Sequence, residues 1–390
     1  MDRSDVTPPG LTRWLQAEAP TSLRAAFLRG GADDDDARAD ADLDLLVFDT
    51  GADDLQVERR HGGDGRRLDL LRAPAALLGQ PQRLAAMGLI THRLLDATLV
   101  LDRDGGGQQA WQQLRRDAWT PAPQQARIAS FLDMGWLTVR EVGVTRDWPA
   151  LALFWLSMAH AAALAAMLDA MRQPCPNVYT RPIRWARRLQ ALAGVDLEPG
   201  LHRLLRPPAG LDAMVAALRA LHAQVRAGCP EPRWHPAMRS STRWEYRYWC
   251  QPAELEERLG AARALDRDGE PAAAAHYLRY TAYSLLRVAM LHQRAVEGWP
   301  RHIPFIRPET ELRPDLLQHH PELLPLAEVL LGRADDEELR AALALTSSVQ
   351  QQALALLEAR GLGPSDRRPW RPFDAAAKTA PSDRNCPPSS

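Results

Sequence analysis

The periodicity of the sequence changes at Pro121 and Pro123, and this change limits the chain to a mixed architecture. Before these prolines, short apolar runs alternate with polar loops rich in glycine and aspartate, which is typical of strands joined by turns. After them, the segments are long, rich in alanine and leucine, and apolar at helical spacing. We therefore predict an α+β fold, in which a small mixed β-sheet domain precedes a large all-α region.

The expected elements follow from these two periodicities. Strands are predicted at 22–30, 42–49, 55–60, 66–72 and 97–102. The third and fourth of them form a hairpin around a glycine-rich turn. Helices are predicted at 11–19, 81–94, 107–117, 124–135, 149–172, 181–194, 210–227, 252–268, 271–297, 322–331 and 336–360.

Shifts in composition divide the chain into four expected units. Residues 1–118 hold the strands, and 119–228 form a first helical domain. A segment rich in Pro, Trp and Arg at 228–251 separates it from a second helical packet at 229–362. Residues 363–390 combine Pro, Ser and charge with few apolar groups, so we expect a disordered tail.

Charge and lysine content restrict the possible partners. The formal net charge of −1 and the pI near 6.8 give no general attraction to nucleic acid, so such a partner would need a local basic patch. The single lysine, Lys378, lies in the expected tail. A P-loop lysine and a Schiff-base lysine are therefore excluded from the rest of the chain. Any phosphate clamp must use arginine or backbone N–H groups.

Cysteine spacing and hydropathy indicate a cytoplasmic protein. The four cysteines are far apart and form no CxxC pair, which fits a reducing compartment. We expect no signal peptide, because the first ten residues contain no apolar run. Residues 150–168 are uncharged and almost long enough to span a bilayer. Because they are rich in alanine and contain Ser157 and His160, we expect a buried helix and no membrane partner.

Two aspartates, Asp42 and Asp44, stand at the start of a strongly apolar strand. Residues at positions i and i+2 of a strand share one face, so both carboxylates are expected to project together. Such a pair is stable when a divalent cation lies between the two charges. Alternatively, Asp42 caps the loop and Asp44 lies on a solvated sheet face. Ten residues separate Asp42 from the diglycine Gly30-Gly31, which ends the preceding apolar run.

A small-residue turn, about ten residues and Asp-x-Asp before an apolar strand resemble the signature of nucleotidyltransferases of the DNA polymerase beta superfamily. Asp69 stands in the next apolar strand, where that family has its third metal-binding carboxylate. Residues 95–105 resemble the closing strand and turn of aminoglycoside-type members. The resemblance covers residues 10–118 and implies Mg²⁺-dependent transfer of a nucleoside monophosphate from a nucleoside triphosphate, ATP by default, to a hydroxyl-bearing acceptor.

The resemblance also implies roles for particular residues. Asp42, Asp44 and Asp69 would be catalytic and would bind Mg²⁺. The backbone at Gly30 and Gly31 would contact the nucleotide phosphates. Arg38, in the loop between these two groups, is a further candidate for a phosphate contact.

Two departures from the family pattern support an alternative function. The family usually has Gly-Ser where this chain has Gly30-Gly31, and often Ser where it has Ala41. A catalytically inactive, antitoxin-like interaction protein with the same fold therefore stays open. The resemblance does not fix the identity of the acceptor. A small hydroxylated molecule is the first expectation, and a protein hydroxyl or an RNA 3′ end are the alternatives. The sequence does not set the oligomeric state.

The helical part adds weaker candidates. Arg181, Arg184 and Arg188 share one face of a predicted helix. Arg184 is thus a candidate for nucleotide binding, as in resembled enzymes whose helical domain closes the cleft, although an exposed basic stripe paired with surface acids has the same spacing. Arg287 and His292 have the Arg-x4-His spacing of HEPN ribonucleases, which gives a nuclease as a third hypothesis.

Overall fold

The computed structural model describes Leu11, Trp14, Leu15 and residues 20–29, 43–61, 67–142, 148–231, 240–296 and 318–363. The predicted helix at 11–19 and the predicted tail at 363–390 lie almost entirely outside these residues. The sheet domain contains β1 (Leu23–Arg29), β2 (Leu43–Asp49), β3 (Gln56–His61), β4 (Arg67–Pro74), η3 (Ala75–Gly79), α2 (Pro81–Ala86), α3 (Gly88–Leu95), β5 (Ala97–Asp102) and α4 (Gly106–Asp117).

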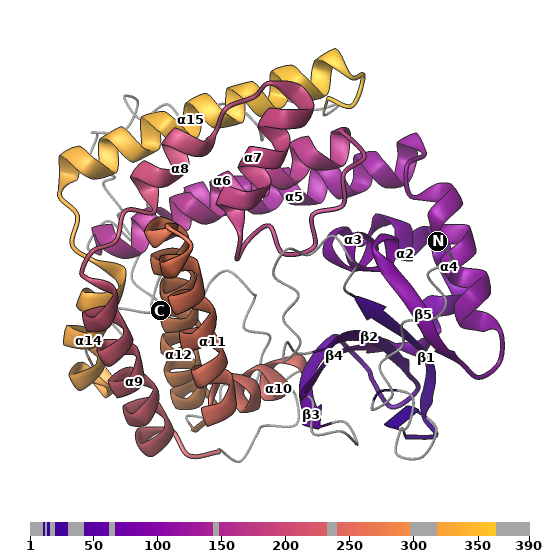
Figure 1. The fold of residues 1–390 in the computed structure, drawn as a ribbon, viewed down its shortest axis with the longest axis horizontal. Coiled ribbons are helices and arrows are strands. Elements are labelled where there is room, and N and C mark those ends of the chain that lie inside the picture. Colours follow the sequence, from indigo (N-terminus) through magenta and orange to yellow (C-terminus); the bar gives the residue numbers. More distant parts are fainter. Residues whose placement is uncertain are drawn as a thin grey trace, which may run out of the picture.

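The described remainder of the chain is helical. It contains α5 (Pro121–Val142), α6 (Pro149–Ala170), α7 (Pro182–Ala193), α8 (Glu198–Leu204), α9 (Leu211–Gly228), α10 (Ser240–Trp249), α11 (Pro252–Arg267), α12 (Pro271–Val296), η5 (Pro321–Leu323), α14 (Leu324–Leu331) and α15 (Asp336–Ala359). Figure 1 shows the sheet domain on one side and these helices on the other. The predicted α+β fold class is confirmed.

The sheet is mixed and has the strand order β3-β4-β2-β1-β5. Strands β2 and β4 run parallel, and the other three neighbouring pairs are antiparallel. All five predicted strands are present, including the β3–β4 hairpin. The parallel pair aligns the starts of β2 and β4 side by side.

Side chains of β2 alternate between the two faces of the sheet. Leu46 and Phe48 join the apolar cluster under α2, α3 and α4, so we call this side the helix-covered face. Leu45 and Val47 pack on the opposite face with Trp14. This alternation is what a strand buried on both faces requires.

The chain between η3 and β5 differs from the prediction of one helix at 81–94. It forms two helices, α2 and α3, because Met87 between them has non-helical dihedral angles (φ −88°, ψ 71°). A Cβ atom at Gly88 would lie 3.0 Å from Cζ of Phe131 on α5, so glycine allows the close approach of α3 to α5. Two short helices, α8 and α10, were not predicted.

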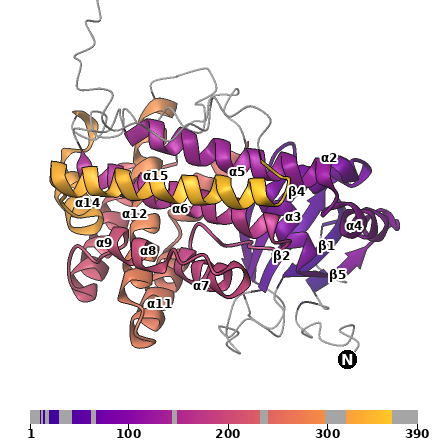
Figure 2. The same cartoon turned by 90° about the horizontal axis from the view of Figure 1, so that it is seen from above.

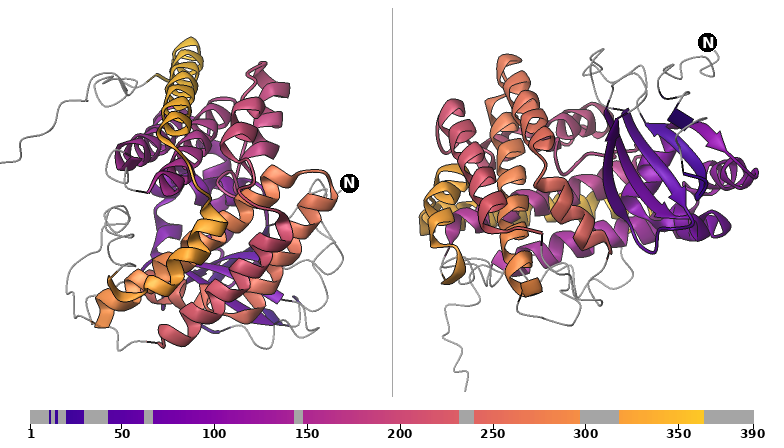
Figure 3. Two further views of the ribbon diagram at one scale, coloured as in Figure 1. Left: turned by 90° about the vertical axis from the view of Figure 1, so that its left-hand side faces the viewer. Right: turned by 90° about the horizontal axis from the view of Figure 1, so that it is seen from below.

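The long helices α5 and α6 pack side by side, and α15 lies along α6 on the outer surface of the helical region (Figures 2 and 3). Helix α6 is apolar and long enough to cross a membrane, but 83% of its most apolar window is buried by the rest of the protein. This burial is typical of a core helix. One apolar cluster extends from Ile128 to Leu357 through both predicted helical units, whose division at 228–229 stays a prediction.

A fully buried ion pair and a neighbouring histidine connect α3 of the sheet domain to α5 and α6 of the helical region. Arg127 of α5 donates to both carboxylate oxygens of Asp169 on α6, from Nε at 2.6 Å and from Nη2 at 3.0 Å. His92 of α3 contacts Asp169 through Nε2 at 2.8 Å. Because all three side chains are completely buried, α3, α5 and α6 are held in one arrangement. That arrangement fixes the position of the site described next.

Candidate functional site

Three charged residues lie at one end of the sheet on its helix-covered face. Asp44 and Asp69 are register partners on the parallel strands β2 and β4. Asp44 has the same strand parity as Leu46 and Phe48, which places both acids on the face that α2, α3 and α4 cover. Arg29 ends β1, the strand next to β2, at the same edge. Three adjacent strands thus bring two carboxylates and one guanidinium together.

Positive charge partly compensates these two carboxylates. Arg29 donates from Nη1 to Oδ2 of Asp44 at 3.0 Å, and the Asp44 side chain is 40% exposed. Arg93 of α3 lies close to the same group. Burial lowers the pKa of the Arg93 guanidinium, whereas the charges of Asp44 and Asp69 raise it and Arg29 lowers it further. The site therefore contains two arginines, Arg29 and Arg93, beside its two acids.

Helix α11 brings two more carboxylates to Asp69. One carboxylate oxygen from each of Asp69, Glu254 and Glu257 lies within 4.8 Å of the others. Glu254 is buried and Glu257 is half-buried, and both lie in the first two turns of α11. Carboxylate oxygens are the ligands that Mg²⁺ and Ca²⁺ prefer. The helical region thus adds oxygen donors to the acid that the sheet supplies.

Arg258 holds this end of α11 in place. It donates from Nε to Glu254, from Nη1 to the Tyr277 hydroxyl at 2.6 Å and from Nη2 to the Tyr248 hydroxyl at 2.9 Å. Burial alone would lower the pKa of Arg258, but Tyr277, Tyr248 and Glu254 raise it well above the ordinary value. Arg258 is consequently a permanent cation that positions Glu254.

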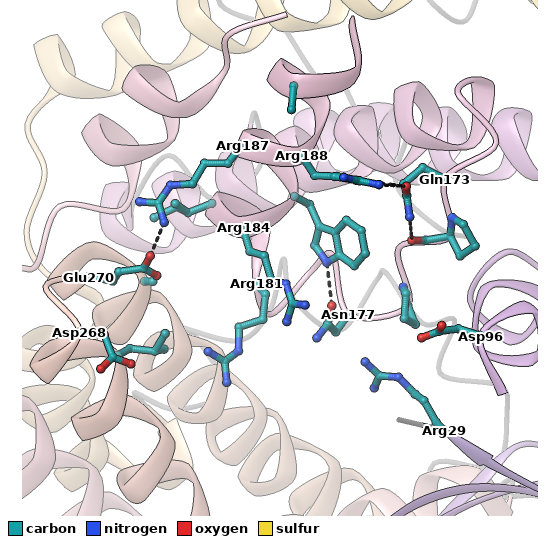
Figure 4. Close-up of a pocket in the computed structure, with 17 residues that line it drawn as sticks. Arg29, Asp96, Gln173, Asn177, Arg181, Arg184, Arg187, Arg188, Asp268 and Glu270 are labelled. Atoms are coloured by element: carbon teal, nitrogen blue, oxygen red, sulfur yellow. Dashed lines mark hydrogen bonds and ion pairs between the residues drawn. The ribbon is translucent and has the colours of Figure 1, made fainter. Parts of the chain in front are cut away.

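A cleft of about 770 Å³ opens between β1, α7 and the α11–α12 turn. Arg29 lines one wall, so the cleft begins beside the Arg29–Asp44 ion pair. Figure 4 shows Arg181 and Arg184 in the middle of this space, between Asp268 on one side and Arg29 on the other. Its charged lining residues are Arg29, Asp96, Arg181, Arg184, Arg187, Arg188, Asp268 and Glu270.

The arginines of α7 have different partners. Arg187 lies between Glu198, at 2.8 Å from Nε, and Glu270, which also accepts from it. The hydrogen bond with Glu270 raises the pKa of Arg187. Arg188 donates from Nε and Nη2 to the amide oxygen of Gln173 at 3.2 and 3.1 Å. Among the described residues, therefore, carboxylates compensate the charge of Arg187, but none pairs with Arg188.

Aromatic rings fix the other two cleft arginines. The guanidinium of Arg181 lies over the Tyr277 ring at 5.3 Å, and that of Arg184 lies over the Trp185 ring at 5.9 Å. Trp185 in turn donates from Nε1 to Oδ1 of Asn177 at 2.7 Å. Such stacking restricts the orientation of a guanidinium.

The structure brings together some of the predicted site residues and not others. Asp44 and Asp69 are neighbours, and Arg184 lines the cleft that reaches Asp44 through Arg29. The other predicted site residues lie outside the described residues; they are Gly30, Gly31, Arg38 and Asp42. Sequence reasoning missed Arg29, Arg93, Glu254 and Glu257. The position of Arg29, directly before the diglycine, was the only available signal for it.

Several histidine, arginine and cysteine side chains elsewhere in the helical region are buried. His160 is buried on α6 and contacts the Thr346 hydroxyl through Nε2 at 2.9 Å, as expected of a core histidine. Arg287 and His292 are 9% and 8% exposed, which leaves an RNA strand little access to them. Cys175 contacts His92 at 3.4 Å, but it is completely buried, and burial raises the pKa of its thiol well above the ordinary value. It therefore lacks the thiolate character of a nucleophile.

Comparison with protein-family models, with curated proteins and with solved structures finds no match to this chain.

Proposed function

We propose that this chain is an Mg²⁺-dependent nucleotidyltransferase that transfers a nucleoside monophosphate from a nucleoside triphosphate, by default ATP, to a hydroxyl of an acceptor. The observation that supports this function best is the pairing of Asp44 with Asp69 on parallel strands, beside Arg29 and Arg93. Two acids brought together on one sheet face, with arginines around them, suit a metal-bound polyphosphate.

The donor set fits magnesium. Asp44 and Asp69 would hold the ion, with Asp42 as the third predicted ligand, and all of these donors are hard carboxylate oxygens. Glu254 and Glu257 lie close enough to Asp69 to add oxygen donors next to it. When bound, the metal would neutralise phosphate charge and orient the reacting groups.

The protein side chains would position the reaction. Arg29 is placed to exchange its contact with Asp44 for a phosphate oxygen, since it also lines the cleft. The acceptor oxygen bonds to the α-phosphorus, and the bond from that phosphorus to the β-phosphate oxygen breaks. Pyrophosphate leaves, and the hydroxyl proton passes to Asp69. In-line positioning and arginine charge would supply most of the rate.

Calorimetry with Mg-ATP tests this function. Asp44→Asn removes one charged ligand, so we expect it to weaken Mg-ATP binding at least about tenfold, given roughly 1.5–3 kcal/mol for a charge-assisted contact. Asp212→Asn, an exposed change on α9, is the matched control and should bind like the wild type. Incubation of the wild type with labelled triphosphates and an acceptor panel should release pyrophosphate. Equal heats from wild type and Asp44→Asn would favour a non-catalytic interaction protein instead.

A further inference from the structure

Tyr277 of α12 connects the carboxylates beside the sheet with the wall of the cleft. Its hydroxyl accepts a hydrogen bond from Nη1 of Arg258 at 2.6 Å, and Nε of the same arginine donates to Glu254. The guanidinium of Arg181, which lines the cleft, lies 5.3 Å from the centre of the Tyr277 ring. One side chain thus contacts both the arginine that holds Glu254 and an arginine of the cleft wall.

Glu254 needs a fixed support, because it lies close to other acids. One of its carboxylate oxygens is within 4.8 Å of one from Asp69 and one from Glu257, and Glu254 is 1% exposed. Buried like charges repel one another unless a counter-charge and hydrogen bonds hold them in place. Arg258 supplies this counter-charge. Its own position depends on hydrogen bonds to two tyrosine hydroxyls, of which Tyr277 accepts the shorter.

From these contacts we infer that Tyr277 is a positioning residue, which holds the Glu254 carboxylate beside Asp69 through Arg258. This inference rests on the proposed function, in which Glu254 adds an oxygen donor next to the metal-binding acids. Burial raises the pKa of the Tyr277 hydroxyl, so this group stays neutral and adds no negative charge to the three acids. The ring is itself fixed, since it is only 8% exposed and contacts Arg181.

Titration of the full-length protein with Mn²⁺ and no nucleotide, followed by electron paramagnetic resonance, tests the inference. Mn²⁺ prefers the same oxygen ligands as Mg²⁺. Tyr277→Phe keeps the ring but removes an acceptor of Arg258, so the affinity for Mn²⁺ should fall about fivefold, as expected for one lost hydrogen bond. The matched control, Tyr283→Phe, lies on the same helix, is 7% exposed and packs its ring 5.0 Å from that of Phe154, so it should bind Mn²⁺ like the wild type. Equal affinities of Tyr277→Phe and the wild type, or no Mn²⁺ binding by the wild type, would overturn the inference.

A double-variant cycle tests whether Tyr277 acts through Glu254. Glu254→Gln removes one charged donor and should weaken Mn²⁺ binding about tenfold. In the Glu254→Gln background, Tyr277→Phe should cause no further loss, because the carboxylate that it positions is already absent. A further fivefold loss in that background, or an unchanged affinity of Glu254→Gln, would contradict the inference.

Urea denaturation separates positioning from folding. Tyr277→Phe should unfold at a urea concentration close to that of Tyr283→Phe. If Tyr277→Phe does not fold, Tyr248→Phe replaces it, because the Tyr248 hydroxyl also accepts from Arg258, at 2.9 Å. This variant should weaken Mn²⁺ binding in the same way, and an unchanged affinity would again speak against the inference.

The proposed reaction gives a readout that a loss of stability alone would not move. Pyrophosphate release by Tyr277→Phe should be slower than that of the wild type at limiting Mg²⁺ and should recover at high Mg²⁺, because excess metal offsets weaker binding. If high Mg²⁺ does not restore the rate, the inference is wrong. Failure of the proposed function is a separate result: the wild type would then release no pyrophosphate, whereas the Mn²⁺ affinities would still decide whether Tyr277 positions Glu254.

Discussion

Asp169→Asn is expected to lower the free energy of unfolding by about 3–5 kcal/mol, which is the typical cost of removing one partner from a buried ion pair. In the wild type, Asp169 accepts two hydrogen bonds from Arg127 and lies 2.8 Å from Nε2 of His92. All three side chains are completely buried. The asparagine side chain has similar size, but it would leave the Arg127 guanidinium buried without a counter-charge. The uncompensated charge of Arg127 accounts for the expected fall in the free energy of unfolding.

Urea denaturation followed by circular dichroism measures this cost, and the slope of the transition should stay unchanged. Arg219→Gln breaks an ion pair between side chains that are 47% and 59% exposed, so it should cost less than about 1 kcal/mol. The double variant Arg127→Met/Asp169→Leu removes both charges and should cost less than Asp169→Asn alone. If Asp169→Asn lowers the free energy of unfolding by no more than Arg219→Gln does, the Arg127–Asp169 ion pair does not stabilise the packing of the sheet domain on the helices.

Two other substitutions test smaller features. Burial lowers the pKa of His160 from 6.5 to about 3. As the pH is lowered from 6.5 to about 3, the unfolded chain therefore binds a proton at this histidine before the folded chain does. The free energy of unfolding should fall by up to about 1.4 kcal/mol for each pH unit in this range. His160→Gln should make the fall in melting temperature over that range shallower. Gly332 has φ +93°, and an added Cβ would lie 2.8 Å from Pro208, so Gly332→Ala should destabilise by about 1–3 kcal/mol. Gly79→Ala, with open space around it, should be neutral in the same unfolding assay.

The fold was predictable where local periodicity and burial agree. The strands were recognisable because their apolar residues pack on both faces of a small sheet, and the long helices because their apolar spacing follows the helical turn. The interruption between α2 and α3 at Met87 could not be predicted from local periodicity. It accompanies the contact between Gly88 and Phe131, which are far apart in the sequence. Helix α10 was missed because it is short and its aromatic residues alternate in the sequence with arginine and glutamate, which is a strand-like spacing, and because it packs against β3.

The candidate site was predictable only on the sheet. Asp44 and Asp69 each stand early in an apolar strand, so strand parity alone indicated a shared face. The acids of α11 gave no such signal. Acids in the first turn of a helix usually complement its dipole, and Glu254 fits that pattern equally well. Its position near Asp69 depends on how α11 packs against the sheet domain, which no local pattern encodes.

The arginines of α7 illustrate why the cleft was harder to predict than the acids of the sheet. Their spacing gave a charged helix face, but an exposed stripe and a cleft wall have the same spacing. The α11–α12 turn and Arg29 on the opposite side make that face a cleft. Under the proposed function, the nucleotide would contact the sheet side of this cleft, at Asp44 and Arg29. Arg188→Gln, on the α7 wall, should therefore leave Mg-ATP binding intact, whereas Asp44→Asn should weaken it. Loss of Mg-ATP affinity in Arg188→Gln would mean that the α7 wall also contacts the nucleotide.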